Sequence, residues 1–284
     1  MDAYLVKNAG RPIAKVDGKR DWIGIEEKEP EGDFSIPQEK KKLRTAKDLQ
    51  EELDNDEEEH ILAAIMRLTK KKNTMTKIVT SREKLSYIPN SETRETLYVS
   101  GPSGSGKSYF AANYATKYQK LFGNPIYLFS TKDEDGVLDE IKGLKRIPIN
   151  ENMLEAEIDY KIFADSLCIF DDVDSLENRK PLAKVVWGLR DTLLQNARSI
   201  NTYVISTVHN TFGYLPTRTS LNESQLVVFF PGNGSDTYIE KYLKTRGGLG
   251  KDTVKWILSI RSRWIAFYVH RPRFILWEYG VKIL

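Results

Sequence analysis

The chain has 284 residues, 40% of them hydrophobic and 29% charged, and a formal net charge of +3. This is the composition of an ordinary globular protein, and the net charge alone gives no argument for a polyanionic partner. The single cysteine, Cys168, excludes an internal disulfide, and no segment approaches the roughly 18 apolar residues of a membrane span. Because the N-terminus also lacks the apolar core of a signal peptide, we expect a soluble protein made in a reducing intracellular compartment.

The length accommodates one domain of about 200 residues with an extension, or two small domains. Residues 1–44 mix Pro, Gly, Lys and Glu without a sustained period, which predicts an irregular arm with short strands near Tyr4–Val6 and Trp22–Ile25. From Thr45 to Lys72 the period is helical, and this charged helix is either solvated or contacts DNA or a partner. We therefore predict an N-terminal extension over residues 1–80 and a main domain over residues 81–284.

After Asn73 the sequence alternates short β-rich segments with segments of helical length. Helices are predicted at 107–121 and 181–198, and strands at Ile78–Thr80, Glu95–Ser100, Ile126–Phe129, Leu167–Asp171, Tyr203–Val208 and Leu226–Phe230. Near-continuous apolar strands separated by helices predict an α/β fold with a mostly parallel central sheet flanked by helices. At the C-terminus, "WIAFYVH" and "RFILWEYG" are separated only by Arg271 and Pro272, which predicts an antiparallel strand pair.

The segment "GPSGSGKS" carries the clearest chemical signal in the chain, because it matches the phosphate-binding loop motif between a predicted strand and a predicted helix. Glycines allow successive amide groups to turn inward around a phosphate, and the helix that follows adds its positive N-terminal dipole. We expect Lys107 to reach the β and γ phosphates of a nucleotide and the Ser108 hydroxyl to bind Mg²⁺. The predicted nucleotide-binding residues are Gly101, Pro102, Ser103, Gly104, Ser105, Gly106, Lys107 and Ser108.

A second motif, "SLCIFDDVD", is a buried strand that ends in two carboxylates, Asp171 and Asp172. The first can hold the magnesium shell and the second can polarise an attacking water, as phosphoryl transfer requires. The alternative is a strand that simply runs into a turn. The position of this segment, after the phosphate loop with a strand between them, favours the catalytic interpretation.

A third strand, "TYVISTVHN", ends in the polar residues Thr207, His209 and Asn210. If this strand lies between the phosphate-loop strand and the acidic strand, His209 or Asn210 can sense the γ phosphate. The alternative for His209 is a structural histidine that satisfies its own hydrogen bonds.

Together, "GPSGSGKS", "CIFDDVD", "ARSINTYVISTVHN" and "LPTRTSLNESQLVVFF" resemble the FtsK/HerA superfamily, P-loop NTPases of the additional-strand type. The closer likeness is to the poxvirus-type DNA-packaging ATPases of large double-stranded DNA viruses and to their relatives in virophages, over residues 90–284. The resemblance implies ATP and Mg²⁺ as cofactors. It also implies a pentameric or hexameric ring that pulls double-stranded DNA, a capsid or vertex protein as partner, and assembly in the host cell cytoplasm or presence in the virion.

The resemblance also assigns roles to individual residues. It makes Asp171 the magnesium carboxylate, Asp172 the catalytic carboxylate and His209 the sensor. Arg198 or Arg218 falls where the family places charges that complete a neighbouring subunit's site, and a surface salt bridge or a DNA contact is the alternative for each. Two positions depart from the family pattern, since many members have Asp-Glu at the acidic pair and Gln at the sensor.

Basic residues gather at the C-terminal end, where the segment from Lys241 to Leu284 has ten Lys or Arg residues against two acids, a net charge of +8. Four arginines there are interleaved with aromatic residues, a pattern that fits either a nucleic-acid surface or a core strand: Arg261, Arg263, Arg271 and Arg273 with Trp264, Phe267, Tyr268 and Trp277. Lys70–Lys72 are a second candidate DNA contact. The alternatives to a DNA-packaging motor are a helicase or recombination motor of the same superfamily, a nucleotide or small-molecule kinase, and a nucleotide-binding switch without turnover.

Overall fold

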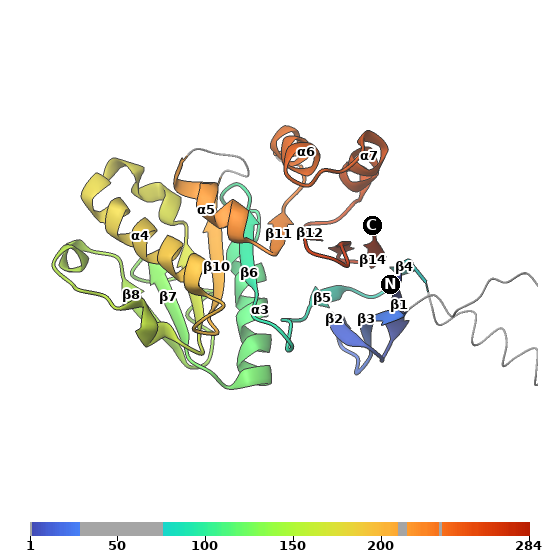
Figure 1. Ribbon diagram of the computed structural model, residues 1–284, viewed down its shortest axis with the longest axis horizontal. Coiled ribbons are helices and arrows are strands. Elements are labelled where there is room, and N and C mark those ends of the chain that lie inside the picture. Colours follow the sequence, from blue (N-terminus) through green and yellow to red (C-terminus); the bar gives the residue numbers. More distant parts are fainter. Residues whose placement is uncertain (1, 29–75, 210–214, 233–234) are drawn as a thin grey trace, which may run out of the picture.

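The computed structural model describes residues 2–28, 76–209, 215–232 and 235–284 (Figure 1). Its main feature is a ten-stranded sheet with six parallel strands. In spatial order these are β11 (Leu226–Phe229), β6 (Thr96–Ser100), β10 (Tyr203–Val208), β9 (Leu167–Asp171), β7 (Ile126–Ser130) and β8 (Leu144–Pro148). Their near-continuous apolar sequences are explained by burial on both faces, and the predicted α/β class with a mostly parallel sheet is confirmed.

The other four strands of this sheet are antiparallel and extend it beyond β11. They are β12 (Ile265–Tyr268), β13 (Phe274–Trp277), β14 (Gly280–Ile283) and β4 (Ile78–Thr80). The pairing of β12 with β13 confirms the predicted C-terminal strand pair, and β14 was missed. Gly280 makes the tight return to β14 possible, since a Cβ there would lie 2.3 Å from the Trp277 ring.

Helices cover the sheet on both faces. On one face lies α3 (Lys107–Phe122), and on the other lie α4 (Lys180–Asn196), α6 (Asp236–Thr245) and α7 (Lys251–Ser259). A further helix, α5 (Leu215–Glu223), connects β10 to β11, and short 3-10 helices occupy Glu151–Leu154, Tyr160–Phe163 and Val173–Asn178. Among the described residues, no helix is both long enough and apolar enough to cross a membrane.

The N-terminal residues form a second, antiparallel sheet where the sequence predicted an irregular arm with short strands. Its strands are β1 (Asp2–Lys7), β3 (Trp22–Lys28), β2 (Arg11–Val16) and β5 (Leu85–Tyr87). Consecutive strands β4 and β5 belong to different sheets, so the short segment between them joins the two sheets. The helix predicted over residues 45–72 lies outside the described residues, and the domain boundary at residue 80 stays a prediction.

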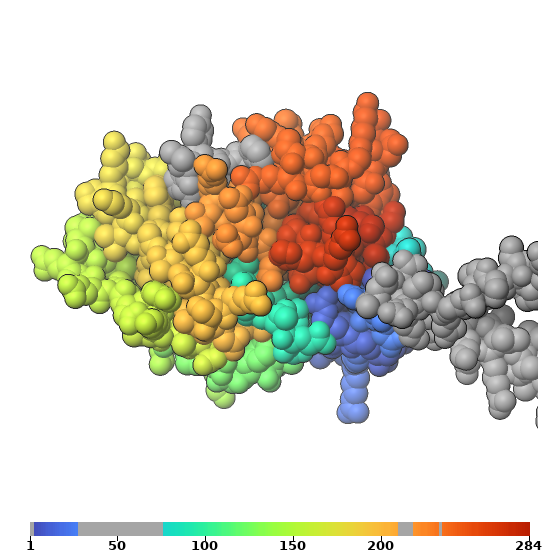
Figure 2. Space-filling model, viewed as in Figure 1, coloured from blue at the N-terminus to red at the C-terminus, as the bar shows by residue number. Residues whose placement is uncertain are grey.

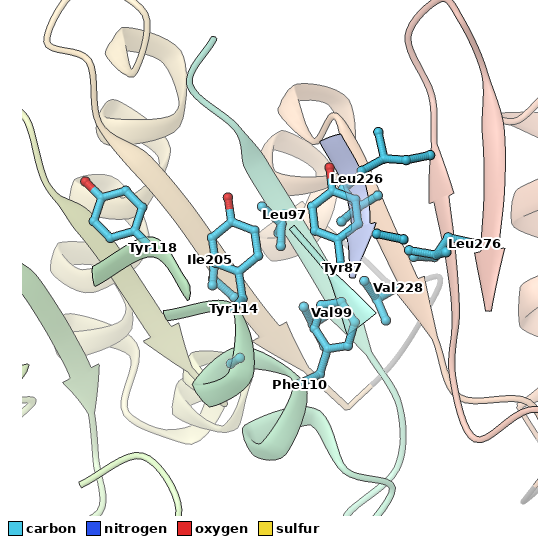
Figure 3. Packing of buried hydrophobic residues seen from close by; sticks show 14 of the residues in the cluster. Tyr87, Leu97, Val99, Phe110, Tyr114, Tyr118, Ile205, Leu226, Val228 and Leu276 are labelled. Carbon is cyan, nitrogen blue, oxygen red and sulfur yellow. The ribbon is translucent and has the colours of Figure 1, made fainter. Parts of the chain in front are cut away.

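A buried carboxylate fixes the small sheet against α3. Glu95 is fully buried and accepts hydrogen bonds from the Tyr87 hydroxyl, from the Tyr114 hydroxyl (2.9 Å) and from the Asn90 N–H (2.9 Å). Tyr87 and Tyr114 also stack in the shared core, beside Leu97 of the main sheet (Figure 3). The space-filling view shows the N-terminal sheet (blue) in contact with the C-terminal strands (red) (Figure 2). The N-terminal sheet is therefore packed onto the main sheet next to α3.

Candidate nucleotide-binding site

The segment from Gly101 to Gly106 forms a loop between the end of β6 and the start of α3. Gly104 and Gly106 have φ angles of 75° and 112°, which side chains rarely tolerate. A Cβ on Gly101 would lie 2.7 Å from the Ser105 hydroxyl and 2.9 Å from the Phe230 ring. The glycines are thus needed for the course of the loop, which ends at the N-terminus of α3, a favourable position for an anion.

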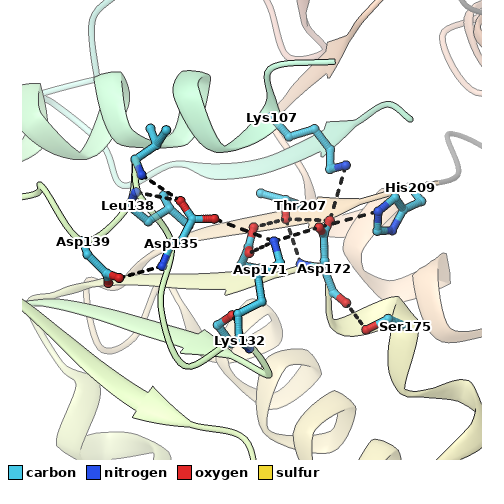
Figure 4. Close-up of polar contacts among 12 residues, drawn as sticks. Lys107, Lys132, Asp135, Leu138, Asp139, Asp171, Asp172, Ser175, Thr207 and His209 are labelled. Atoms are coloured by element: carbon cyan, nitrogen blue, oxygen red, sulfur yellow. Dashed lines mark hydrogen bonds and ion pairs between the residues drawn. The ribbon is translucent and has the colours of Figure 1, made fainter. Parts of the chain in front are cut away.

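Lys107 is buried and lies between this loop and the acidic pair. Its ammonium donates to the Gly101 carbonyl (Nζ–O 2.9 Å) and the Pro102 carbonyl (3.4 Å), and lies 3.4 Å from Oδ1 of Asp172 (Figure 4). Ser108, the predicted Mg²⁺ ligand, is partly exposed in the first turn of α3. The Lys107 ammonium therefore contacts both the phosphate loop and the acidic pair.

The strand order brings the three predicted motifs to one edge of the sheet. Strand β10 lies between β6 and β9, with Val208 opposite Ser100 and Ser206 opposite Phe170. Because all three strands are parallel, their carboxyl ends meet. The condition set for a sensing role, that "TYVISTVHN" lies between the other two strands, is therefore met.

Asp171 ends β9 with a side chain that is almost fully buried, 1% exposed as a residue. Its Oδ1 accepts a hydrogen bond from the Thr207 hydroxyl (2.9 Å), whose oxygen in turn accepts from the Asp172 N–H (2.9 Å). Burial raises the pKa of Asp171, and the charge of Asp172 adds to this effect. One hydroxyl thus fixes both members of the acidic pair.

Asp172 adopts a left-handed backbone conformation, with a φ of 49°. Its side chain is mostly buried and has three cationic or imidazole neighbours. Oδ1 lies 3.4 Å from Lys107 Nζ, and Oδ2 lies 3.5 Å from Lys132 Nζ and 3.6 Å from His209 Nε2 (Figure 4). Strained backbone is common where a side chain must be aimed at a reacting group, and here it turns the carboxylate toward the phosphate loop.

His209 lies beside the acidic pair and is held there by Asp174. The His209 N–H donates to Asp174 Oδ2 (2.9 Å), and its Nδ1 lies 3.5 Å from Asp174 Oδ1. The ligand atoms of Asp172, Asp174 and His209 lie within 4.8 Å of one another. The predicted magnesium ligands are a different set, the Ser108 hydroxyl and the Asp171 carboxylate, and such hard oxygen donors suit Mg²⁺. Asn210, the other predicted sensor, lies outside the described residues.

Lys132 is a member of the site that sequence reasoning missed. It follows β7, whose Ser130 lies opposite Asp171, and its ammonium lies 3.3 Å from Asp171 Oδ2 and 3.5 Å from Asp172 Oδ2. The Lys132 ammonium thus contacts both carboxylates, which shows that the acidic pair attracts positive charge. The only available signal was a lysine just after a predicted strand, which becomes informative only once β7 is known to neighbour β9.

Comparison with known proteins gives one relative of high similarity. Protein V3 of the Sputnik virophage, itself uncharacterised, is 38% identical over 210 residues, which cover 73% of this chain and 84% of V3. The chain belongs to the V3 family. No protein-family model matches it.

Solved structures resemble this V3-family chain at low sequence identity. The genome-packaging NTPase B204 of Sulfolobus turreted icosahedral virus 2, in complex with AMPPCP, is 13% identical with a TM-score of 0.45, covering 65% of this chain and 97% of B204. The conjugation coupling protein TcpA of pCW3, with ATPγS, is 12% identical with a TM-score of 0.48, covering 72% of this chain and 65% of TcpA. V3 confirms the predicted resemblance to virophage proteins.

The two candidate arginines lie at opposite edges of the sheet in this V3-family chain. Arg198 is exposed in the turn between α4 and β10, close to Arg94, at the amino ends of the strands. Arg218 is exposed in the first turn of α5, the helix that returns from the phosphate-loop edge. The structure brings neither arginine into contact with the acidic pair described above, and the role of either in a neighbouring subunit stays a prediction.

The aromatic residues of the C-terminal basic cluster are mostly core residues. Phe267, Tyr268 and Trp277 are buried in β12 and β13, so of the two alternatives the core strand holds for these three residues. Arg273 lies over the Phe267 ring and donates to the Gly247 carbonyl. Arg263 is instead at the phosphate loop, where its Nη2 lies 3.5 Å from the position that a Cβ on Gly106 would occupy.

Proposed function

We propose that the protein is an ATPase that translocates double-stranded DNA and packages a viral genome into a preformed capsid. The observation that carries this proposal is the convergence of the phosphate loop, the acidic pair and Thr207 at one edge of the sheet. A phosphate cradle facing two carboxylates on neighbouring strands supports hydrolysis of a nucleoside triphosphate. Membership of a virophage protein family and the resemblance to viral packaging motors support DNA as the substrate of the motion.

The described residues have separate roles in this hydrolysis. Amides of the loop bind the phosphates, and the Lys107 ammonium stabilises negative charge that grows on the terminal phosphate. Asp172, aimed by its left-handed backbone, orients the attacking water and accepts its proton. Thr207 holds both carboxylates in place.

Magnesium fits the same site. Ser108 and Asp171 would hold it, and when bound it would neutralise charge on the phosphates. Lys132 would balance the charge of the acidic pair, and His209, 3.6 Å from Asp172 Oδ2, would act as the sensor.

We extend the proposal to the assembly. A ring of five or six subunits would place an arginine, Arg218 or Arg198, at the site of the neighbouring subunit, where it stabilises the transferring phosphate. Double-stranded DNA would pass through the ring, and a capsid or vertex protein would hold the ring at the assembly site in the host cytoplasm. DNA contacts would be made mainly to phosphates, and binding would weaken as salt rises.

ATP turnover with and without linear duplex DNA tests this function. The wild type should be stimulated by DNA, and Lys107→Ala and Asp172→Asn should lose turnover at least a hundredfold. Lys120→Ala, an exposed lysine in the last turn of the same helix, is the matched control and should behave as wild type. Turnover that ignores DNA but rises with a small phosphate acceptor would favour a kinase instead.

A further inference from the structure

A pocket lies on the side of the phosphate loop away from the acidic pair. Its volume is about 130 Å³, room for part of a small-molecule ligand. Three parts of the chain contribute to its wall, the N-terminal sheet region, α3 and the C-terminal strands: Asp17 and Ser86, Tyr109 and Asn113, Arg263 and Trp264. The pocket shares only the phosphate loop with the nucleotide-binding site described above, because Ser105 and Gly106 of that loop also line the pocket.

The direction of a bound nucleotide follows from the placement of Lys107. A P-loop lysine reaches the β and γ phosphates while the loop amides hold the α and β phosphates. Since Lys107 lies 3.4 Å from Asp172, the terminal phosphate belongs on the acidic side. The remaining part of the nucleotide must then leave the loop at its other side, where Gly106 and Tyr109 line the pocket.

Two aromatic side chains give the pocket surfaces that suit a flat base. Tyr109 is 66% exposed although it lies in the first turn of α3, directly after the phosphate-loop motif. Trp264 is partly buried and packs edge-on against Phe110, with ring centroids 5.3 Å apart. Both rings line the same pocket, and aromatic rings in this position can stack on a flat ring system.

Polar groups around these rings are fixed by hydrogen bonds. Asp17 Oδ1 accepts from the Ser86 hydroxyl (2.6 Å), and the Asp17 carboxylate can accept further bonds from ribose hydroxyls or an exocyclic amine. The Glu278 carboxylate, in a residue only 7% exposed, accepts a hydrogen bond from the backbone N–H of Arg263 (2.7 Å), and its Oε1 lies 3.5 Å from Lys84 Nζ. Glu278 therefore links two segments: the turn that contains Arg263, and Lys84, which directly precedes β5 of the N-terminal sheet.

We propose that this pocket binds the nucleoside part of the nucleotide, so that the N-terminal sheet is a wall of the nucleotide site. The proposal rests on the nucleotide binding proposed above. Tyr109 and Trp264 contact the base, Asp17 accepts from the ribose or the base, and Arg263 lies near the α phosphate. The occupant is a nucleoside triphosphate, and inorganic tripolyphosphate would fill the loop alone.

Calorimetric binding of Mg²⁺-ATP and of Mg²⁺-tripolyphosphate to the full chain separates these two parts of the site. Tyr109→Ala and Asp17→Ala should each weaken ATP binding about tenfold or more and leave tripolyphosphate binding within twofold of wild type. Lys107→Ala should weaken both ligands. Tyr238→Ala, which removes another exposed tyrosine from α6, is the matched control and should change neither.

Two other outcomes would contradict the pocket proposal, and one of them would also contradict the ATPase proposal. If the wild type binds both ligands and neither pocket variant discriminates between them, the nucleoside pocket is wrong and the ATPase proposal stands. If the wild type binds neither ligand, the ATPase proposal fails and the pocket proposal fails with it. Circular dichroism of Tyr109→Ala, an exposed position, establishes that the variant is folded.

Discussion

The single hydroxyl of Thr207 links both members of the acidic pair, because it donates to Asp171 and accepts from the backbone N–H of Asp172. Thr207→Val keeps the shape of the side chain and removes both hydrogen bonds next to a buried carboxylate. We expect a loss of about 1–3 kcal/mol in the free energy of unfolding and a fall of at least tenfold in ATP turnover. Denaturant unfolding and steady-state turnover measure these effects, and Thr207→Ser should retain both properties. A valine variant with full turnover would show that the hydroxyl does not position the pair.

Lys132 balances the charge of the acidic pair, and this gives a pH prediction. The pKa of Asp171 is raised mainly by burial, while the Lys132 ammonium, 3.3 Å from Oδ2, opposes the rise. Removing that positive charge in Lys132→Met disfavours the ionised carboxylate, so the pKa of Asp171 should rise further. If the ionised form of Asp171 is required, the acid limb of the turnover profile should move to higher pH. Lys142→Met, an exposed lysine elsewhere, should leave the profile unchanged, and an unmoved limb in Lys132→Met would contradict the coupling.

At the scale of the elements, the contact between α3 and the N-terminal sheet contains a poorly solvated amine. Lys117 donates to the Tyr87 carbonyl (2.7 Å), and burial lowers the pKa of this lysine to about 7. An unfolded lysine keeps its proton up to about pH 10.4, so between these values the unfolded state binds more protons and stability rises with pH. The slope is at most about 1.4 kcal/mol per pH unit. Unfolding of wild type and Lys117→Met at pH 7.5 and 9 should show that the wild type gains stability relative to the variant. Equal gains in both proteins would contradict the lowered pKa.

The same elements show what a sequence can and cannot predict about this fold. The strand before the phosphate loop, the acidic strand and the third strand have long apolar segments with polar ends, so the strands and their polar carboxyl ends could be predicted. Their spatial order is known only from the structure. In the N-terminal region, the strands near Tyr4–Val6 and Trp22–Ile25 were predicted and are present as β1 and β3. Their assembly into a sheet was not predicted, because the paired strands β2 and β5 are about 70 residues apart in the chain. Lys132 and the pocket beside Tyr109 depend on such contacts between distant segments, and no local pattern marks them.

At the scale of the whole molecule, the position of Arg218 makes it the better candidate for action on a neighbouring subunit. It is exposed on the helix that returns from the phosphate-loop edge, whereas Arg198 lies at the amino ends of the strands. Arg218→Ala and Asp172→Asn should each be inactive alone. Mixed in equal amounts, they should regain measurable DNA-stimulated turnover, because some interfaces would then combine an intact Arg218 with an intact Asp172.

The matched mixture replaces Arg218→Ala with Lys107→Ala. Lys107 and Asp172 act within one site, so a mixture of Lys107→Ala with Asp172→Asn leaves each subunit with a defective site and should stay inactive. No recovery in the Arg218→Ala mixture would mean that Arg218 does not act across an interface.

The proposed function requires that ATP bound at the loop drives movement along double-stranded DNA. Displacement of a third strand from linear duplex DNA measures such movement directly. We predict displacement by the wild type with Mg²⁺-ATP, and none with a nonhydrolysable analogue or with Asp172→Asn. If the wild type hydrolyses ATP on this DNA while the third strand stays bound, the protein is an ATPase but not a translocating motor, and the proposed function is wrong.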